Sequence, residues 1–158
     1  MQSVNPSLIL LVGIPGSGKS TFAKEYVTNS EDSVKILSSD TIRKELYGDE
    51  NIQGNPEEVF SLMKTRTVDY LNDGCTVLYD ATNITRKDRA SIISVCPKFV
   101  RIECDIVWAK IDTCKERNSK RSRVVPEEVI DRMLNKFQLP FYDEGIDEIY
   151  IINREKDC

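Results

Sequence analysis

The segment GIPGSGKST, residues 13–21, constrains the fold of this chain more than any other part of its sequence. It follows the apolar run SLILLV without a break and leads into a segment with helical spacing of apolar residues. Its three glycines allow backbone N–H groups to turn inward around an anion, and the following helix would present its positive end to the same anion. The segment therefore predicts a buried strand, an anion-binding loop and a helix, in that order.

The spacing of this loop matches the pattern G-x-x-x-x-G-K-[ST]. In that pattern the lysine reaches the β- and γ-phosphates of a nucleoside triphosphate, and the next hydroxyl ligates Mg²⁺. We therefore interpret the loop as a P-loop and expect ATP and Mg²⁺ as its ligands. The residues expected to hold the triphosphate are Gly13, Gly16, Ser17, Gly18, Lys19, Ser20 and Thr21.

Apolar patterns along the rest of the chain predict strands that alternate with helices. Short apolar runs predict strands over residues 7–13, 33–39, 75–83, 98–105 and 148–153. Helical spacing and helix-start signals predict helices over residues 19–29, 40–46, 56–74, 86–96, 107–118 and 126–137. This alternation is typical of a parallel sheet covered by helices. We expect one α/β domain over residues 1–158, with a P-loop NTPase fold and a five-stranded parallel sheet that has helices on both faces.

Composition limits the possible functions. The chain of 158 residues has a formal net charge of −4 and no histidine, so a general base has to be a carboxylate or, less readily, a lysine, cysteine or tyrosine. The negative charge argues against a protein that coats nucleic acid, although it does not exclude one local basic patch. Five unpatterned cysteines predict reduced thiols, with Cys158 as a loose C-terminal thiol. With no signal peptide and no membrane-length apolar run, we expect a cytoplasmic protein without membrane contact.

Two acidic candidates follow predicted strands, where ligands gather in a doubly wound sheet. Asp40 and Arg43 share one face of a short helix after the second strand. Asp40 is a candidate general base and Arg43 a candidate for an anionic part of the acceptor, with helix capping as the alternative role of Asp40.

Asp80 ends the third strand and is a candidate for the Mg²⁺ site. Thr82 and Asn83 would line the same cleft. The alternative for Asp80 is a cap of the helix that begins near Arg86.

A basic segment forms the third candidate. Residues 109–125 contain six basic and two acidic residues, a net charge of +4. Arg117 and Arg121 have i, i+4 spacing and could close over the triphosphate and stabilise charge on the transferring phosphoryl group. The alternative is a solvated helix end whose cations complement the helix dipole.

Together, the motifs GIPGSGKST, SSDTIR, DATNITRKDR, KERNSKR followed by VP, and FQLPFYDEG resemble one family over nearly the whole chain. This family is the 5′-hydroxyl polynucleotide kinase domain of bacteriophage and bacterial end-healing enzymes, within the P-loop kinase superfamily. The resemblance implies that Lys19 and Ser20 serve the donor phosphates and Mg²⁺, that Asp40 is the general base, and that Arg43 binds the phosphate next to the 5′ nucleoside. It implies lid roles for Arg117 and Arg121, with Arg121 contacting the donor phosphates.

The expected activity is ATP-dependent phosphorylation of the 5′-OH end of DNA or RNA. Many members of this family carry a phosphatase, ligase or other domain fused to the kinase. Here the chain departs from the family, and we expect a lone kinase module with any such activity supplied by a partner chain. A kinase for a small hydroxyl-bearing molecule is the first alternative, because related small kinases share the sequence DATN. A nucleotide-dependent ATPase switch is the second.

Overall fold

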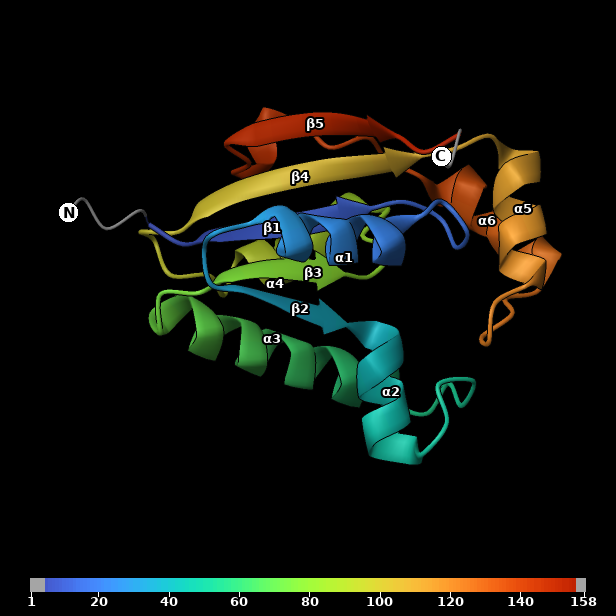
Figure 1. Ribbon diagram of the computed structural model, residues 1–158, viewed down its shortest axis with the longest axis horizontal. Helices are drawn as coiled ribbons and strands as arrows, with labels where there is room; N and C mark the ends of the chain where they lie inside the picture. The colour runs from blue at the N-terminus through green and yellow to red at the C-terminus, as the bar shows by residue number, and fades with distance from the viewer. Residues whose placement is uncertain (1–4, 156–158) are drawn as a thin grey trace.

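The apolar runs of the sequence form one parallel sheet in the computed structural model, which describes residues 5–155 (Figure 1). The strand order is β2-β3-β1-β4-β5, and all neighbouring strands are parallel. This confirms the predicted five-stranded sheet. The strands are β1 (Ser7–Val12), β2 (Val34–Ser38), β3 (Thr76–Asp80), β4 (Arg101–Trp108) and β5 (Glu148–Asn153).

Helices follow the strands as the sequence predicts, with two helix boundaries that are wrong by three or more residues. The helix expected to reach Cys96 ends at Ile93. The helix expected from Val107 begins only at Ile111, because Val107 and Trp108 extend β4 and pair with Ile152 and Asn153 of β5. The helices are α1 (Lys19–Asn29), α2 (Ser39–Tyr47), α3 (Pro56–Asn72), α4 (Arg86–Ile93), α5 (Ile111–Ser119) and α6 (Glu127–Lys136), with a 3₁₀ turn η1 (Tyr142–Glu144).

The central strand β1 is buried on both faces, which explains its unbroken apolar sequence. On one face, Leu8 and Leu10 belong to the main core, to which α2, α3 and α4 contribute. On the other face, Ile9 and Leu11 pack with Ala23 of α1. Helices therefore cover both faces of the sheet, while α5 and α6 lie beyond the carboxyl ends of the strands (Figure 1).

The structure bears on two expectations from the sequence, the absence of a membrane-spanning segment and the reduced state of the cysteines. Within residues 5–155, no helix has both the length and the apolar character to span a bilayer. The cysteines in this range, Cys75, Cys96, Cys104 and Cys114, are free thiols. Cys158 lies outside the described residues.

A fully buried arginine ties α4 to the loops around it. Arg89 donates from Nε to a carboxylate oxygen of Glu144 at 2.9 Å and from Nη1 to the backbone oxygen of Asn83 at 2.9 Å. The side chains of Arg89 and Glu144 are 0% and 5% exposed. Because removal of one partner would leave a buried charge uncompensated, this pair is a structural brace.

We predict that Arg89→Ala lowers the free energy of unfolding by about 3–5 kcal/mol, the usual loss when one member of a buried ion pair is removed. Arg86→Ala is the matched control. Arg86 lies on the same helix, and its side chain is 42% exposed. It pairs with exposed Asp143 at 3.2 Å and only at 3.8 Å with Glu144, so its loss should be much smaller. Urea denaturation of both variants measures the difference. Equal losses would contradict the assignment of Arg89 as the brace.

A buried acidic residue lies on β4, away from the ends of the strands. Asp105 is 3% exposed, and one of its carboxylate oxygens has no hydrogen-bond partner among residues 5–155. Burial, followed by a hydrogen bond to Glu103 and the negative charge of Glu103, raises the pKa of Asp105 to about 8. The pKa of nearby Tyr26 is also raised, first by burial and then by the charges of Glu103 and Asp105.

This shift predicts a pH dependence of stability. An aspartate in the unfolded chain titrates near pH 3.9. The protonated Asp105 carboxyl therefore favours the folded state below that pH, and this contribution is lost as the pH rises toward about 8. We expect Asp105→Asn to gain stability relative to the wild type between pH 4 and pH 8. Urea midpoints across this range measure the gain, with exposed Asp69→Asn as the control; parallel profiles for wild type and Asp105→Asn would contradict it.

Candidate active site

The glycines of the P-loop fit the space between β4 and α5. The backbone N–H of Gly13 donates to the backbone oxygen of Thr82 at 3.0 Å, and a Cβ at Gly13 would lie 2.7 Å from the backbone oxygen of Val107. Gly16 has a left-handed φ of +84°, and a Cβ there would overlap the backbone of Cys114. A side chain at Gly13 would push the loop away from β4, and one at Gly16 would push it away from α5.

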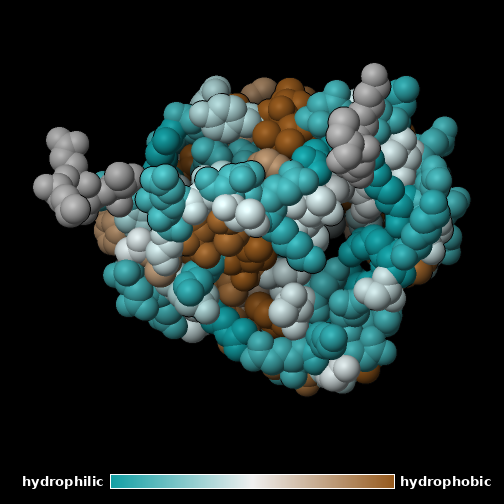
Figure 2. All heavy atoms as spheres, viewed as in Figure 1, coloured by the Kyte–Doolittle hydropathy of each residue, from teal (hydrophilic) through white to brown (hydrophobic). Residues whose placement is uncertain are grey.

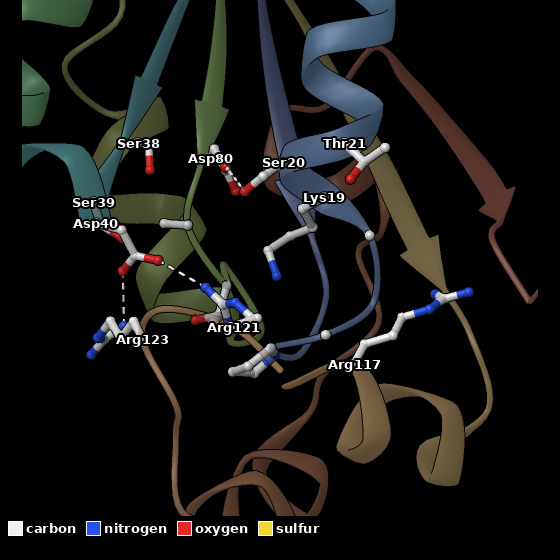
Figure 3. Close-up of a pocket in the computed structure, with 15 residues that line it drawn as sticks. Lys19, Ser20, Thr21, Ser38, Ser39, Asp40, Asp80, Arg117, Arg121 and Arg123 are labelled. Atoms are coloured by element: carbon white, nitrogen blue, oxygen red, sulfur yellow. Dashed lines mark hydrogen bonds and ion pairs between the residues drawn. The ribbon is translucent and has the colours of Figure 1, made fainter. Parts of the chain in front are cut away.

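A cavity of about 380 Å³ lies at the carboxyl ends of the strands, between the P-loop, α2 and the segment after α5 (Figure 3). Ten of the predicted site residues line it: Gly16, Gly18, Lys19, Ser20, Thr21, Asp40, Asp80, Thr82, Arg117 and Arg121. Gly13 and Ser17 do not line it. The Ser17 hydroxyl is buried and has no hydrogen-bond partner among the described residues. It therefore remains available to form a hydrogen bond within the P-loop.

Lys19 points into this cavity (Figure 3). Its Nζ donates to the backbone oxygen of Ile14 at 3.1 Å. Burial lowers the pKa of Lys19, while the charge of Asp80 opposes the shift. Because burial penalises the lysine cation, a phosphate beside it would be strongly favoured.

Ser20 and Asp80 lie side by side as a magnesium site requires. The Ser20 hydroxyl donates to a carboxylate oxygen of Asp80 at 2.8 Å. Hydroxyl and carboxylate oxygens are the ligands that Mg²⁺ prefers, and the cation binds proteins through few such groups together with substrate phosphates. Asp80 does not cap α4, because the side chain of Thr85 accepts from the backbone N–H of Asp88 at that helix start. The pair therefore fits Mg²⁺, and the capping alternative is wrong.

Asp40 is surrounded by guanidinium groups (Figure 3). One of its oxygens accepts from Arg43 at 3.2 Å and from Arg123 at 2.9 Å, and the other accepts from Arg121 at 2.9 Å. The capping alternative is wrong here too, because Ser38 caps α2. Arg123 was not predicted as a site residue, although it belongs to the basic segment.

The basic segment divides into two groups. Lys115 and Lys120 form exposed ion pairs with Asp131 and Glu116, as expected for a solvated helix end. The three arginines of the segment line the cavity instead.

Arg117 and Arg121 are four residues apart in the sequence, but they do not lie on one helix. The helix α5 ends at Ser119, before Arg121. Arg117 reaches away from Asp40 and donates to the backbone oxygen of Arg154 at 2.7 Å (Figure 3). Arg117 and Arg121 therefore line the same cavity without sharing a helix, and their closing over the triphosphate stays a prediction.

A larger cavity of about 950 Å³ adjoins the first, and the two share Pro15, Ser39, Ala81, Thr82 and Arg123 as lining residues. Arg43 lines only the larger cavity, is 5% exposed, and its Nε has no hydrogen-bond partner within residues 5–155. Burial and repulsion from Arg123 lower the pKa of Arg43. A buried guanidinium with an unused donor is suited to an anion.

Asn83 also lines the larger cavity, but its amide nitrogen is engaged by the protein. It donates to the backbone oxygen of Leu11 at 2.8 Å, and its φ of 48° is left-handed. This contact fastens the end of β3 to β1. A substrate-binding role for Asn83 stays a prediction.

The parallel sheet, the glycine loop after its central strand and the Ser20–Asp80 pair define a P-loop kinase-like nucleotide-binding fold. Residues 8–140 match the model of the AAA domain family AAA_33, and the chain belongs to this family. P-loop kinases in general use ATP and Mg²⁺.

Similar proteins act on different acceptors. The chain is 29% identical over 149 residues to L-seryl-tRNA(Sec) kinase of Methanococcus maripaludis, a match that covers 84% of this chain and 53% of that protein. Among solved structures it resembles a chain of the Pnkp1/Rnl/Hen1 RNA repair complex (TM-score 0.72, 23% identity, covering 90% of this chain and 46% of that one). It also resembles a gluconokinase from Sinorhizobium meliloti 1021 (TM-score 0.63, 16% identity, covering 97% and 85%). The chain thus spans about half the length of this curated relative, and the acceptor does not follow from the comparisons.

The close approach of Gly16 to α5 allows a test of whether this packing shapes the nucleotide site. We predict that Gly16→Ala weakens ATP binding at least about tenfold, or about 1.4 kcal/mol, because the new Cβ displaces the loop. Gly74→Ala is the control, since Gly74 has the same φ of +84° but open space around it. Calorimetric titration with ATP–Mg²⁺ compares the two. Equal affinities would mean that the packing against α5 does not shape the nucleotide site.

Proposed function

We propose that the protein transfers the γ-phosphate of ATP to the 5′-hydroxyl end of a DNA or RNA strand. Membership of a P-loop kinase family supports phosphate transfer. The likeness to a chain of the Pnkp1/Rnl/Hen1 complex supports a nucleic-acid acceptor. The proposal extends to a cytoplasmic enzyme of one domain, with a partner chain that supplies ligase or phosphatase activity.

In this proposal, the phosphate donor ATP binds in the smaller cavity. Lys19 and the backbone N–H groups of the loop bind the phosphates, and Ser20 and Asp80 hold Mg²⁺. When bound, the cation neutralises charge on the phosphates during transfer. Little covalent chemistry is left to the protein, so positioning and electrostatics supply most of the rate.

One observation carries the acceptor half: Asp40 and Arg43 contact each other where the two cavities meet. Asp40 lines the cavity with the P-loop lysine, and Arg43 lines the adjoining one. An acceptor whose phosphate binds Arg43 would therefore bring a nearby hydroxyl to Asp40. In a strand with a free 5′-hydroxyl, the nearest phosphate is the one on the 3′ side of the first nucleoside. Asp40 then accepts the hydroxyl proton while the hydroxyl oxygen attacks the γ-phosphorus. The bond from that phosphorus to the β–γ bridging oxygen breaks, and ADP leaves.

The arginines on Asp40 have a second role in this proposal. Arg121 and Arg123 now hold the carboxylate through hydrogen bonds of 2.9 Å. In the reaction they move to the donor phosphates, where they stabilise the charge that develops on the transferring group. Their departure frees Asp40 to accept a proton. Arg121 thereby has the donor-phosphate role that the sequence implies.

The test is transfer of labelled γ-phosphate from ATP–Mg²⁺ to a short oligonucleotide with a 5′-hydroxyl. A strand that already bears a 5′-phosphate is the control. Label only on the hydroxyl strand supports the proposal. No transfer to DNA or RNA, together with tight ATP binding, would overturn it and favour a small hydroxyl-bearing acceptor.

In the same assay, Asp40→Asn should reduce kcat at least about 100-fold, the scale of a removed general base, while ATP still binds. Asp69→Asn, an exposed carboxylate on α3, should have wild-type activity. Undiminished turnover in Asp40→Asn would rule out Asp40 as the base even if the acceptor is correct.

A further inference from the structure

The larger cavity extends well beyond the position of Arg43. Its volume of about 950 Å³ is at the upper end of the roughly 300–1,000 Å³ of small-molecule sites. Figure 2 shows the face on the side of α1, which is hydrophilic around a central hydrophobic patch and is hollowed near the carboxyl ends of the strands. This larger cavity, called the groove below, has room for more than the one nucleotide that would contact Asp40 and Arg43.

Two lysines extend the positive charge of Arg43 along the groove. Lys64 lies on α3 and Lys87 in the first turn of α4, and both line the cavity. Within the described part of the chain, neither forms an ion pair. Lys64 shares a face of α3 with other lining residues at helical spacing, namely Glu57, Phe60, Ser61 and Thr65.

The charge balance of the groove differs in sign from that of the chain. Four cationic residues, Arg43, Lys64, Lys87 and Arg123, line it together with two acidic residues, Glu57 and Asp88. The net lining charge is therefore +2, whereas the chain carries −4. Such a local reversal concentrates a polyanion in one place and leaves the remaining surface repulsive to it.

Apolar residues form the rest of the wall. Phe60 comes from α3, Val129 and Met133 from α6, and Val124, which is 52% exposed, from the loop between α5 and α6. Aromatic and apolar surfaces bind unpaired bases largely without regard to their sequence. Cationic and apolar walls in one groove suit a single strand with splayed bases better than a sugar or another small polar acceptor.

We propose that Lys64 and Lys87 form a second phosphate-binding region of the acceptor site, which selects single strands of several nucleotides over mononucleotides. This inference rests on the proposed function for its chemistry. Arg43 binds the first phosphate, and the two lysines bind phosphates farther from the reacting end. The selected acceptor is thus a single-stranded 5′-hydroxyl oligonucleotide.

The experiment compares acceptors that differ only in length. The ratio of kcat/KM for a 5′-hydroxyl hexanucleotide to that for a nucleoside 3′-monophosphate measures the selectivity. We expect Lys64→Gln/Lys87→Gln to lower this ratio about tenfold. Loss of two contacts to a single strand should also make the salt dependence of hexanucleotide kcat/KM less steep by about 1.4 in log–log slope. Lys24→Gln/Lys98→Gln removes the same charge from exposed positions outside the groove and should keep both values.

The outcomes separate this inference from the proposed function. Suppose that oligonucleotides are phosphorylated but Lys64→Gln/Lys87→Gln, the groove variant, keeps the wild-type ratio of kcat/KM values. The proposed phosphate-binding role of the two lysines is then wrong, and the kinase assignment stands. If no oligonucleotide is phosphorylated, anisotropy with labelled 5′-phosphorylated strands of the same lengths measures the groove alone. Length-dependent binding that the groove variant loses would then support the groove without the reaction. Binding that is absent, or independent of length or of the lysines, would overturn the inference.

Discussion

The burial of β1 on both faces and along both edges is the constraint on which the site depends. Its neighbours β3 and β4 hold it in parallel register, so the carboxyl ends of three strands meet at one place. The P-loop begins there, with Gly13 bonded to the segment after β3 and packed against the end of β4. Asp80 lies directly beside Ser20 for the same reason. The chemistry of the site is therefore fixed by the position of one apolar strand.

Much of this arrangement could be predicted from the sequence because its signals are local. The glycine loop, the apolar runs and the capping residues each act over a few neighbouring positions. The end of β4 could not be found in this way, since Val107 and Trp108 are strand residues only through their pairing with β5. Likewise, whether Asp40 or Ser38 caps α2 depends on where the chain leaves β2, which composition alone does not determine.

The contacts across the site were the least predictable part. Arg123 reaches Asp40 across 83 positions of sequence, and Arg89 reaches Glu144 across 55. Arg89 belongs to the motif DATNITRKDR and Arg123 to the basic segment, but neither pattern shows which carboxylate an arginine will meet. The brace formed by Arg89 also supports the carbonyl of Asn83, and the amide of Asn83 in turn holds β1. Asn83, which the sequence suggests as a substrate-binding residue, thus also fixes the ends of β1 and β3.

The three guanidinium groups around Asp40 have a consequence for water. Both oxygens of Asp40 already accept hydrogen bonds from arginines, so fewer of their lone pairs are left to bind a passing water molecule. In a phosphotransferase, an exposed and unpaired base beside bound ATP would favour wasteful hydrolysis. If Asp40 has the proposed role of general base, these contacts would also keep it from activating water beside ATP. The same ion pairs that keep the loop after α5 near α2 would therefore protect ATP until an alcohol takes the place of water.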